Sequence, residues 1–181
     1  MTPVPGTRLG ITDDGPRFDA IPHSEDHSTI VVTKDSVRST VQRNGYRDYV
    51  GVRIRDENGT VVAEHRFIGL LGSAAYTESV THIPVLRAKA SRVLALSGYR
   101  ANSHGGKAVI RTIAEFPRDA LFEASAEELV PLIMTIVDLR EKQRLRALVR
   151  RGPWGRFFHL LVFVPTDRFD ASTVGAVSYT H

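Results

Sequence analysis

Apolar and polar residues alternate along the stretch from Thr29 to Leu70. The sequence "TIVVT" at 29–33 predicts a strand, and "RSTVQ" at 38–42 predicts another. The alternation in "RDYVGVRIR" is that of a half-buried strand. Its two faces carry Val50, Val52 and Ile54 on one side and Tyr49, Arg53 and Arg55 on the other. The Asn58-Gly59 pair favours a tight turn into a return strand, "TVVAEHRFIGLL". We therefore expect an antiparallel sheet with one solvated face.

Helical spacing replaces this alternation from Pro84 onward. The stretch "PVLRAKASRVLALSG" predicts a helix with Pro84 in its first turn and Gly98 just beyond its end. Ser103 is placed to cap a short second helix, which "FPRD" ends at Pro117. Residues 77–125 are therefore expected to form a helical connector.

A longer helix, from Ala126 to about Arg140, is predicted by an apolar stripe and by the capping-box spacing of Ser125 and Glu128. Two strands follow it, "LRALVRR" and "RFFHLLVFVP". The second is almost continuously apolar, which is typical of a central strand buried on both faces, and we assign this role to 157–164. A helix followed by two strands is half of a βαββαβ unit.

The leader and the composition add limits. Pro and Gly residues interrupt 1–28, so we expect this leader to be poorly ordered. The chain has no Cys, which excludes disulfides and thiolate metal sites. It also has no secretory signal pattern and no run of roughly 20 apolar residues, so no membrane association is expected.

Candidate catalytic groups do not form a convincing constellation. Ser73, His104 and Asp119 can be written as a triad, but no nucleophile-elbow motif supports it. His23 and His27 have helical metal-ligand spacing without an evident third ligand. The "HGGK" stretch lacks the spacing and the Ser/Thr of a phosphate-binding loop, and there is no dinucleotide fingerprint. His65 and His159 lie within predicted strands, where packing or solvent exposure explains them. We therefore assign no catalytic, cofactor-binding or metal-binding residue.

Positive charge is concentrated near the C-terminus. Between Arg140 and Arg156 there are six Arg and one Lys against one Glu, a net charge of +6, whereas the whole chain has a formal net charge of +4. The arginines at positions 144, 146, 150, 151 and 156 surround Trp154 on the predicted hairpin. Arginine beside an exposed aromatic ring is one way of holding single-stranded nucleic acid. The alternative is an ordinary solvated face. This alternative is favoured, because one aromatic residue in a turn is weak support for the stacking of bases.

Long ordered motifs resemble one known family. "TKDSVRSTVQRNGYRDYVGVRIRDENGTVVAEHRFIGLLGSAAYTESVTHIPVLRAKASRVL" is similar to part of the N-terminal region of the large bacterial NAD-dependent glutamate dehydrogenases. "NSHGGKAVI", "FPRDALFEASAEELVPL" and "RRGPWGRFFHLLVFVPTDRF" resemble the same region in the same order. The resemblance covers roughly 29–170.

This resemblance implies a cytoplasmic, homo-oligomeric parent enzyme that converts L-glutamate, NAD and water to 2-oxoglutarate, ammonia and NADH in a C-terminal domain absent from these residues. The matching region implies regulatory and assembly modules of ACT-like and PAS-type fold, with no cofactor of their own. We therefore expect an α+β fold. It has a leader at 1–28, an antiparallel PAS-like sheet at 29–76, the connector at 77–125 and a partial ACT-like (βαββ) module at 126–181.

Three functions follow as alternatives. The first is a non-catalytic regulatory and assembly segment whose partner is the remainder of the dehydrogenase chain. The second is a stand-alone ACT-like module that senses an amino-acid effector. The third is a nucleic-acid-binding protein that uses the basic hairpin. We further expect the two hairpins to lie in separate sheets and the isolated chain to lack dehydrogenase activity. We also expect the isolated chain to self-associate, because a partial ACT-like module leaves an apolar surface uncovered.

Overall fold

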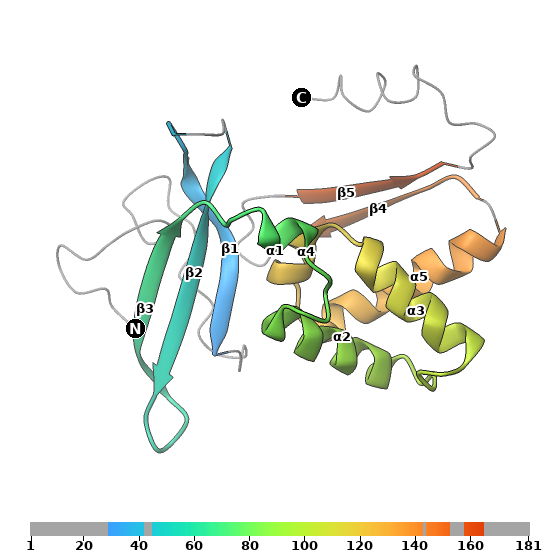
Figure 1. Cartoon of the computed structure of the whole chain (residues 1–181), viewed down its shortest axis with the longest axis horizontal. Helices are drawn as coiled ribbons and strands as arrows, with labels where there is room; N and C mark the ends of the chain where they lie inside the picture. The colour runs from blue at the N-terminus through green and yellow to red at the C-terminus, as the bar shows by residue number, and fades with distance from the viewer. Residues whose placement is uncertain (1–28, 42–44, 143, 153–157, 165–181) are drawn as a thin grey trace.

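A computed structural model describes residues 29–41, 45–142, 144–152 and 158–164 (Figure 1). Within these ranges the chain is α+β, with a three-stranded and a two-stranded antiparallel sheet separated along the sequence by five helices. The two predicted hairpins therefore do lie in separate sheets, as expected. The proposed leader at 1–28 lies outside the described residues. No helix among those described is long and apolar enough to cross a membrane.

The first sheet has the strand order β1-β2-β3. Its strands are β1 (Ile30–Arg38), β2 (Tyr46–Arg55) and β3 (Val61–Gly69). The turn between β2 and β3 contains Gly59 with φ of +80°, a conformation that glycine adopts without a Cβ penalty. The predicted separate strand at 38–42 is wrong as far as it is described, because β1 itself continues to Arg38 and residues 39–41 are not in a strand.

The more buried face of this sheet is its polar one. Tyr49 is fully buried, and its hydroxyl donates a hydrogen bond to Glu64, which also lies beside Arg53 and Arg66. Burial raises the pKa of Tyr49, and the bond to Glu64 raises it further. A Cβ on Gly51 would lie 2.9 Å from the Glu64 side chain, so glycine leaves the space that this carboxylate occupies. The predicted alternation is correct, but the Val50, Val52 and Ile54 face is only half-buried or exposed.

The helices begin and end largely where local signals place them. They are α1 (Ala74–Thr77), α2 (Pro84–Leu96), α3 (His104–Glu115), α4 (Arg118–Glu123) and α5 (Ala126–Lys142). Pro84 stands in the first turn of α2, and Gly98 follows its end with φ of +75°. The Ser103 hydroxyl accepts a bond from the Gly106 amide at 3.0 Å. Ser125 and Glu128 form the predicted capping box, with bonds of 2.9 and 3.1 Å.

The apolar core lies among α2, α3, α4 and α5. Its fully buried members include Leu86, Val109, Leu129 and Ile133, one or two from each of the three longer helices. Apolar side chains at helical spacing bring these faces together, and burial of each large aliphatic side chain contributes roughly 1.5–3 kcal/mol. The helices therefore form the stable centre on which both sheets are placed.

The second sheet is a hairpin of β4 (Arg146–Arg151) and β5 (Phe158–Phe163). One of its faces packs against the helical core through Leu148, Leu161 and Phe163. The assignment of 157–164 to a central strand buried on both faces is wrong. In the described part, β5 pairs with β4 alone, and Phe158 and Leu160 on its other face are 68% and 53% exposed.

Candidate functional site

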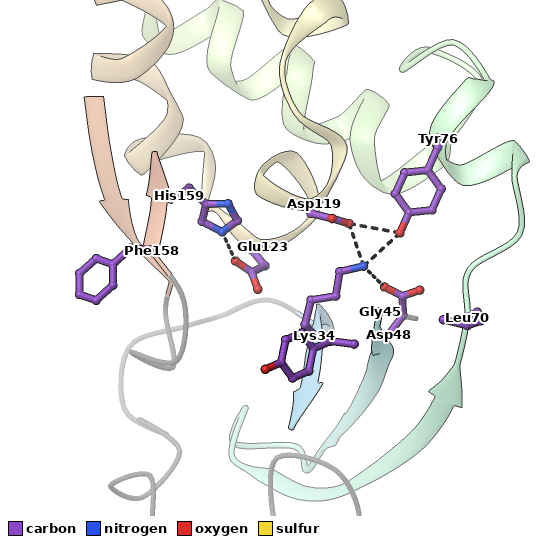
Figure 2. Close-up of a pocket in the computed structure, with 10 residues that line it drawn as sticks. Lys34, Gly45, Asp48, Leu70, Tyr76, Asp119, Glu123, Phe158 and His159 are labelled. Atoms are coloured by element: carbon purple, nitrogen blue, oxygen red, sulfur yellow. Dashed lines mark hydrogen bonds and ion pairs between the residues drawn. The ribbon is translucent and has the colours of Figure 1, made fainter. Parts of the chain in front are cut away.

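A cavity of about 520 Å³ opens where the first sheet, the helices and the hairpin approach one another (Figure 2). Its wall combines ionisable side chains with aromatic and aliphatic ones. The lining residues are Lys34, Gly45, Tyr46, Asp48, Leu70, Tyr76, Asp119, Glu123, Phe158 and His159.

One group of side chains in this wall, the Lys34 cluster, consists of Lys34, Asp48, Tyr76 and Asp119. The Lys34 ammonium lies 2.6 Å from Asp48 Oδ1, 3.2 Å from Asp119 Oδ1 and 3.2 Å from the Tyr76 hydroxyl. The Tyr76 hydroxyl in turn donates to Asp119 at 3.2 Å. These contacts connect β1 and β2 with α1 and α4.

Burial of Lys34 opposes its charge, but the hydrogen bonds to Asp48 and Tyr76 and the nearby Asp119 outweigh burial and raise the pKa of Lys34. Burial also raises the pKa of Tyr76. Lys34 therefore remains a cation, and Tyr76 remains a protonated donor at neutral pH. Asp48 has a second role, because its other oxygen accepts the Leu71 amide at 2.7 Å and so fixes the chain that leaves β3.

The second group, the Glu123 cluster, consists of Glu123, Thr33, Arg150 and His159. The Glu123 side chain is only 3% exposed and accepts a bond of 2.5 Å from the Thr33 hydroxyl. It lies 2.8 Å from His159 Nε2 and 3.6 Å from the Arg150 guanidinium, which also contacts Glu128 at 3.1 Å. One carboxylate at the end of α4 therefore joins β1 to the β4–β5 hairpin.

Charge and hydrogen bonds explain how Glu123 stays ionised in a buried position. Burial alone would raise its pKa, but the bonds from His159 and Thr33 and the nearby Arg150 outweigh burial and lower the pKa of Glu123. For the Glu123 carboxylate to accept a hydrogen bond from His159, the imidazole must carry a proton on Nε2. Each carboxylate of the cavity wall thus has a basic partner, Lys34 for Asp48 and Asp119 and His159 for Glu123, which suits a structural junction.

Neither cluster could be predicted from sequence, because the members of each cluster are far apart in the chain. Thr33 and Glu123 are separated by 90 positions, and α4, which carries Asp119 and Glu123, was not predicted as a separate helix. His159 was recognised only as a histidine within a strand. Its contact with Glu123 depends on how the hairpin packs, which no local motif reports.

The candidates considered from sequence have other roles in the structure. Asp119 bonds Tyr76 and Lys34, so the triad with Ser73 and His104 gains no support. The glycines of "HGGK" are explained by packing, since a Cβ on Gly106 would lie 2.0 Å from the Arg100 carbonyl oxygen. No group of three or more potential metal ligands occurs in the described ranges, and His23 and His27 lie outside them.

The basic hairpin is less available than its sequence suggests. Arg150 is 9% exposed and directed to Glu128 and Glu123, whereas Arg144, Arg146 and Arg151 are exposed. Trp154 and Arg156 lie outside the described residues. At least one arginine therefore serves the Glu123 cluster and does not face solvent.

Comparisons with known proteins find sequence similarity to NAD-specific glutamate dehydrogenases. Residues 83–142, which comprise helices α2 to α5, match the family model for glutamate dehydrogenase, helical motif 1. The chain is 35% identical over 136 residues, or 75% of its length, to the NAD-specific glutamate dehydrogenase of Halomonas elongata. It is 34% identical over 92% of its length to that of Pseudomonas aeruginosa, and 30% identical over 91% to that of Mycobacterium tuberculosis. The chain spans only about a tenth of the length of these relatives, 8% of the first and 10% of the other two.

Proposed function

We propose that this chain is an N-terminal, non-catalytic regulatory and assembly segment of an NAD-specific glutamate dehydrogenase. In this proposal the conversion of L-glutamate, NAD and water to 2-oxoglutarate, ammonia and NADH takes place in another, C-terminal part of such an enzyme. Its partner is that remaining part of the polypeptide, and the assembled enzyme is a cytoplasmic homo-oligomer.

The observation that carries the proposal is the extent of the similarity. Nearly the whole chain, 92%, matches a stretch that is only 10% of the Pseudomonas aeruginosa enzyme. Most of that enzyme therefore has no counterpart among these residues. The arrangement of the cavity supports the same reading, because Lys34 and Glu123 hold structural elements together through partners within the chain.

The finer fold assignment is also part of the proposal. The order of α5, β4 and β5 supports half of an ACT-like βαββαβ unit, and the antiparallel β1–β3 sheet supports part of a PAS-type module. In such an arrangement helices α2, α3 and α4 lie between the two modules, and α5 belongs to the second one. The domain boundaries at residues 28, 76 and 125 remain predictions.

A chimeric enzyme tests the proposal. The segment of the Pseudomonas aeruginosa enzyme that matches this chain is replaced by the corresponding residues of this chain, and NADH formation from glutamate and NAD is measured. We expect the chimera to be active and the purified 181-residue chain alone to form no NADH. The control is the same enzyme with the segment deleted, which should lose its native assembly. NADH formation by the isolated chain, or a folded chimera without activity, would contradict the proposal.

The cavity favours one second candidate, an amino-acid-sensing module. Its volume of about 520 Å³ lies within the usual range for small-molecule sites, and its wall carries carboxylates, an ammonium and aromatic rings. An amino acid would have to compete with the internal contacts of Lys34 and Glu123. Titration calorimetry with the 20 common amino acids tests this candidate, and the absence of saturable binding would remove it.

A further inference from the structure

The outward face of the β4–β5 hairpin is almost entirely apolar. Val149 and Leu160 lie opposite each other, as do Ala147 and Val162 in the next cross-strand pair. Val149, Phe158 and Leu160 are 64%, 68% and 53% exposed. These side chains alternate with those that pack against the helical core, so the hairpin has one covered face and one open face that is mainly apolar. A contiguous open face of this kind marks an interaction surface.

The described residues of the hairpin carry charge of one sign. Residues 144–152 and 158–164 contain four Arg and no Asp or Glu. Arg150 is directed inward to Glu128 and Glu123, whereas Arg144, Arg146 and Arg151 are exposed. Arg151 lies on the open face opposite Phe158, whereas Arg146 alternates onto the face of Leu148, which packs against the core. An occupant of the open face would therefore meet an apolar centre with Arg151 at one end, and an acidic side chain there would complement it.

We propose that this hairpin face binds an amphipathic helix contributed by the remaining part of the dehydrogenase, with an apolar stripe and an acidic side chain that meets Arg151. The inference rests on the proposed function, because the chain corresponds to about a tenth of its relatives and most of such an enzyme lies outside it. Two paired strands about 4.8 Å apart present a face about 10 Å wide, which matches the diameter of one helix. About 13 helical residues would cover a six-residue strand pair.

One other occupant fits the surface less well. Single-stranded nucleic acid needs aromatic stacking surfaces, but Val149, Leu160 and Val162 are aliphatic, and Phe158 is the aromatic residue among the described side chains of this face.

Photo-crosslinking in the active chimera tests the inference. The photoreactive amino acid p-benzoylphenylalanine replaces Val149 in one variant and Leu160 in a second. The matched control replaces Ile110, an apolar residue of α3 that is 43% exposed. After irradiation, mass spectrometry identifies the linked peptides. We expect positions 149 and 160 to link to one common peptide of the dehydrogenase outside the matched segment, with acidic residues beside its apolar ones. Position 110 should not link to it, and Arg151→Glu should weaken the link.

Four results would overturn the inference. They are crosslinks to the same hairpin of a second copy, crosslinks to nucleic acid, crosslinks to residues 165–181, and crosslink yields at positions 149 and 160 no higher than at position 110. An active chimera with any of them leaves the proposed function intact. If the chimera does not assemble, the proposed function is contradicted. The modified 181-residue chain is then mixed with the Pseudomonas aeruginosa enzyme that lacks the segment, and failure to link to it overturns the inference independently.

Discussion

Replacing Glu123 by glutamine should destabilise the fold far more than the same change at an exposed glutamate. Glu123→Gln keeps the side-chain shape and an acceptor for the Thr33 hydroxyl, but it removes the negative charge beside Arg150 and His159. Arg150, at a position that is 9% exposed, then retains Glu128 as its acidic partner among the described residues. The main cost is that the Arg150 guanidinium stays buried after it has lost the Glu123 carboxylate as a partner.

The magnitude follows from burial. Removing one partner of a buried ion pair costs about 3–5 kcal/mol. Because Arg150 retains Glu128 and His159 is 21% exposed, we expect the lower end, about 3 kcal/mol, which is a large part of the 5–15 kcal/mol that stabilises a typical domain. Glu127→Gln is the matched control, since its ion pair with Arg92 is 61% and 60% exposed and should contribute less than about 1 kcal/mol.

Urea unfolding followed by circular dichroism gives both free energies. A second experiment places Glu123→Gln in an Arg150→Met background, where no buried cation remains and the cost should shrink, since an intact pair can be replaced by apolar groups at little cost. Equal destabilisation by Glu123→Gln and Glu127→Gln would refute the argument. An unchanged cost in the Arg150→Met background would also refute it.

The lowered pKa of Glu123 adds a pH dependence. Because the folded state holds the pKa below its ordinary value of 4.5, ionised Glu123 stabilises the fold above that pH, and this contribution is lost as the pH falls through the lowered pKa. The Glu123→Gln variant lacks this contribution at every pH. Its stability should therefore fall less steeply than that of the unaltered chain during acid titration, and parallel acid limbs would contradict the assignment.

Two further substitutions test the helical core, each by the midpoint of urea unfolding. Gly106→Ala should cost about 3 kcal/mol or more, because its Cβ would lie 2.0 Å from the Arg100 carbonyl oxygen. The control is Gly72→Ala, whose Cβ would meet nothing within 4 Å and which should be nearly neutral. Equal effects of the two substitutions would contradict the close approach at Gly106. Leu129→Ala should cost about 2–5 kcal/mol because Leu129 is fully buried, and Leu96→Ala, at a position 39% exposed, should cost clearly less; the reverse order would place the core elsewhere.

Local signals in the sequence were sufficient for the elements whose ends are set by neighbouring residues. Pro84, Ser103, Gly98 and the Ser125–Glu128 pair act within one helical turn, and each stands where it was predicted. The turn at Gly59 follows the same logic. Capping and turn chemistry depend on a few adjacent residues, so a single sequence is enough to read them.

Features that depend on distant partners could not be predicted in this way. The apolar run in β5 indicated a strand but not the number of strands beside it, and its burial on both faces was therefore wrongly inferred. In the first sheet, Tyr49 and Arg53 are more buried than Ile54, because Glu64 on the neighbouring strand satisfies their polar groups. A polar side chain can be buried once its partner is supplied, and the partner comes from tertiary structure.

The two kinds of interaction divide the molecule into a helical centre and attached sheets. Apolar packing is concentrated in α2 to α5, the part that matches the glutamate dehydrogenase helical motif. The Lys34 and Glu123 clusters instead connect these helices to β1 and to the β4–β5 hairpin through ion pairs and hydrogen bonds. Apolar packing depends little on direction, whereas hydrogen bonds and ion pairs require a defined geometry. The helices therefore supply the apolar part of the stability of this chain. The polar clusters set the position of its sheets and add to its stability through buried groups such as Glu123, whose side chain is 3% exposed.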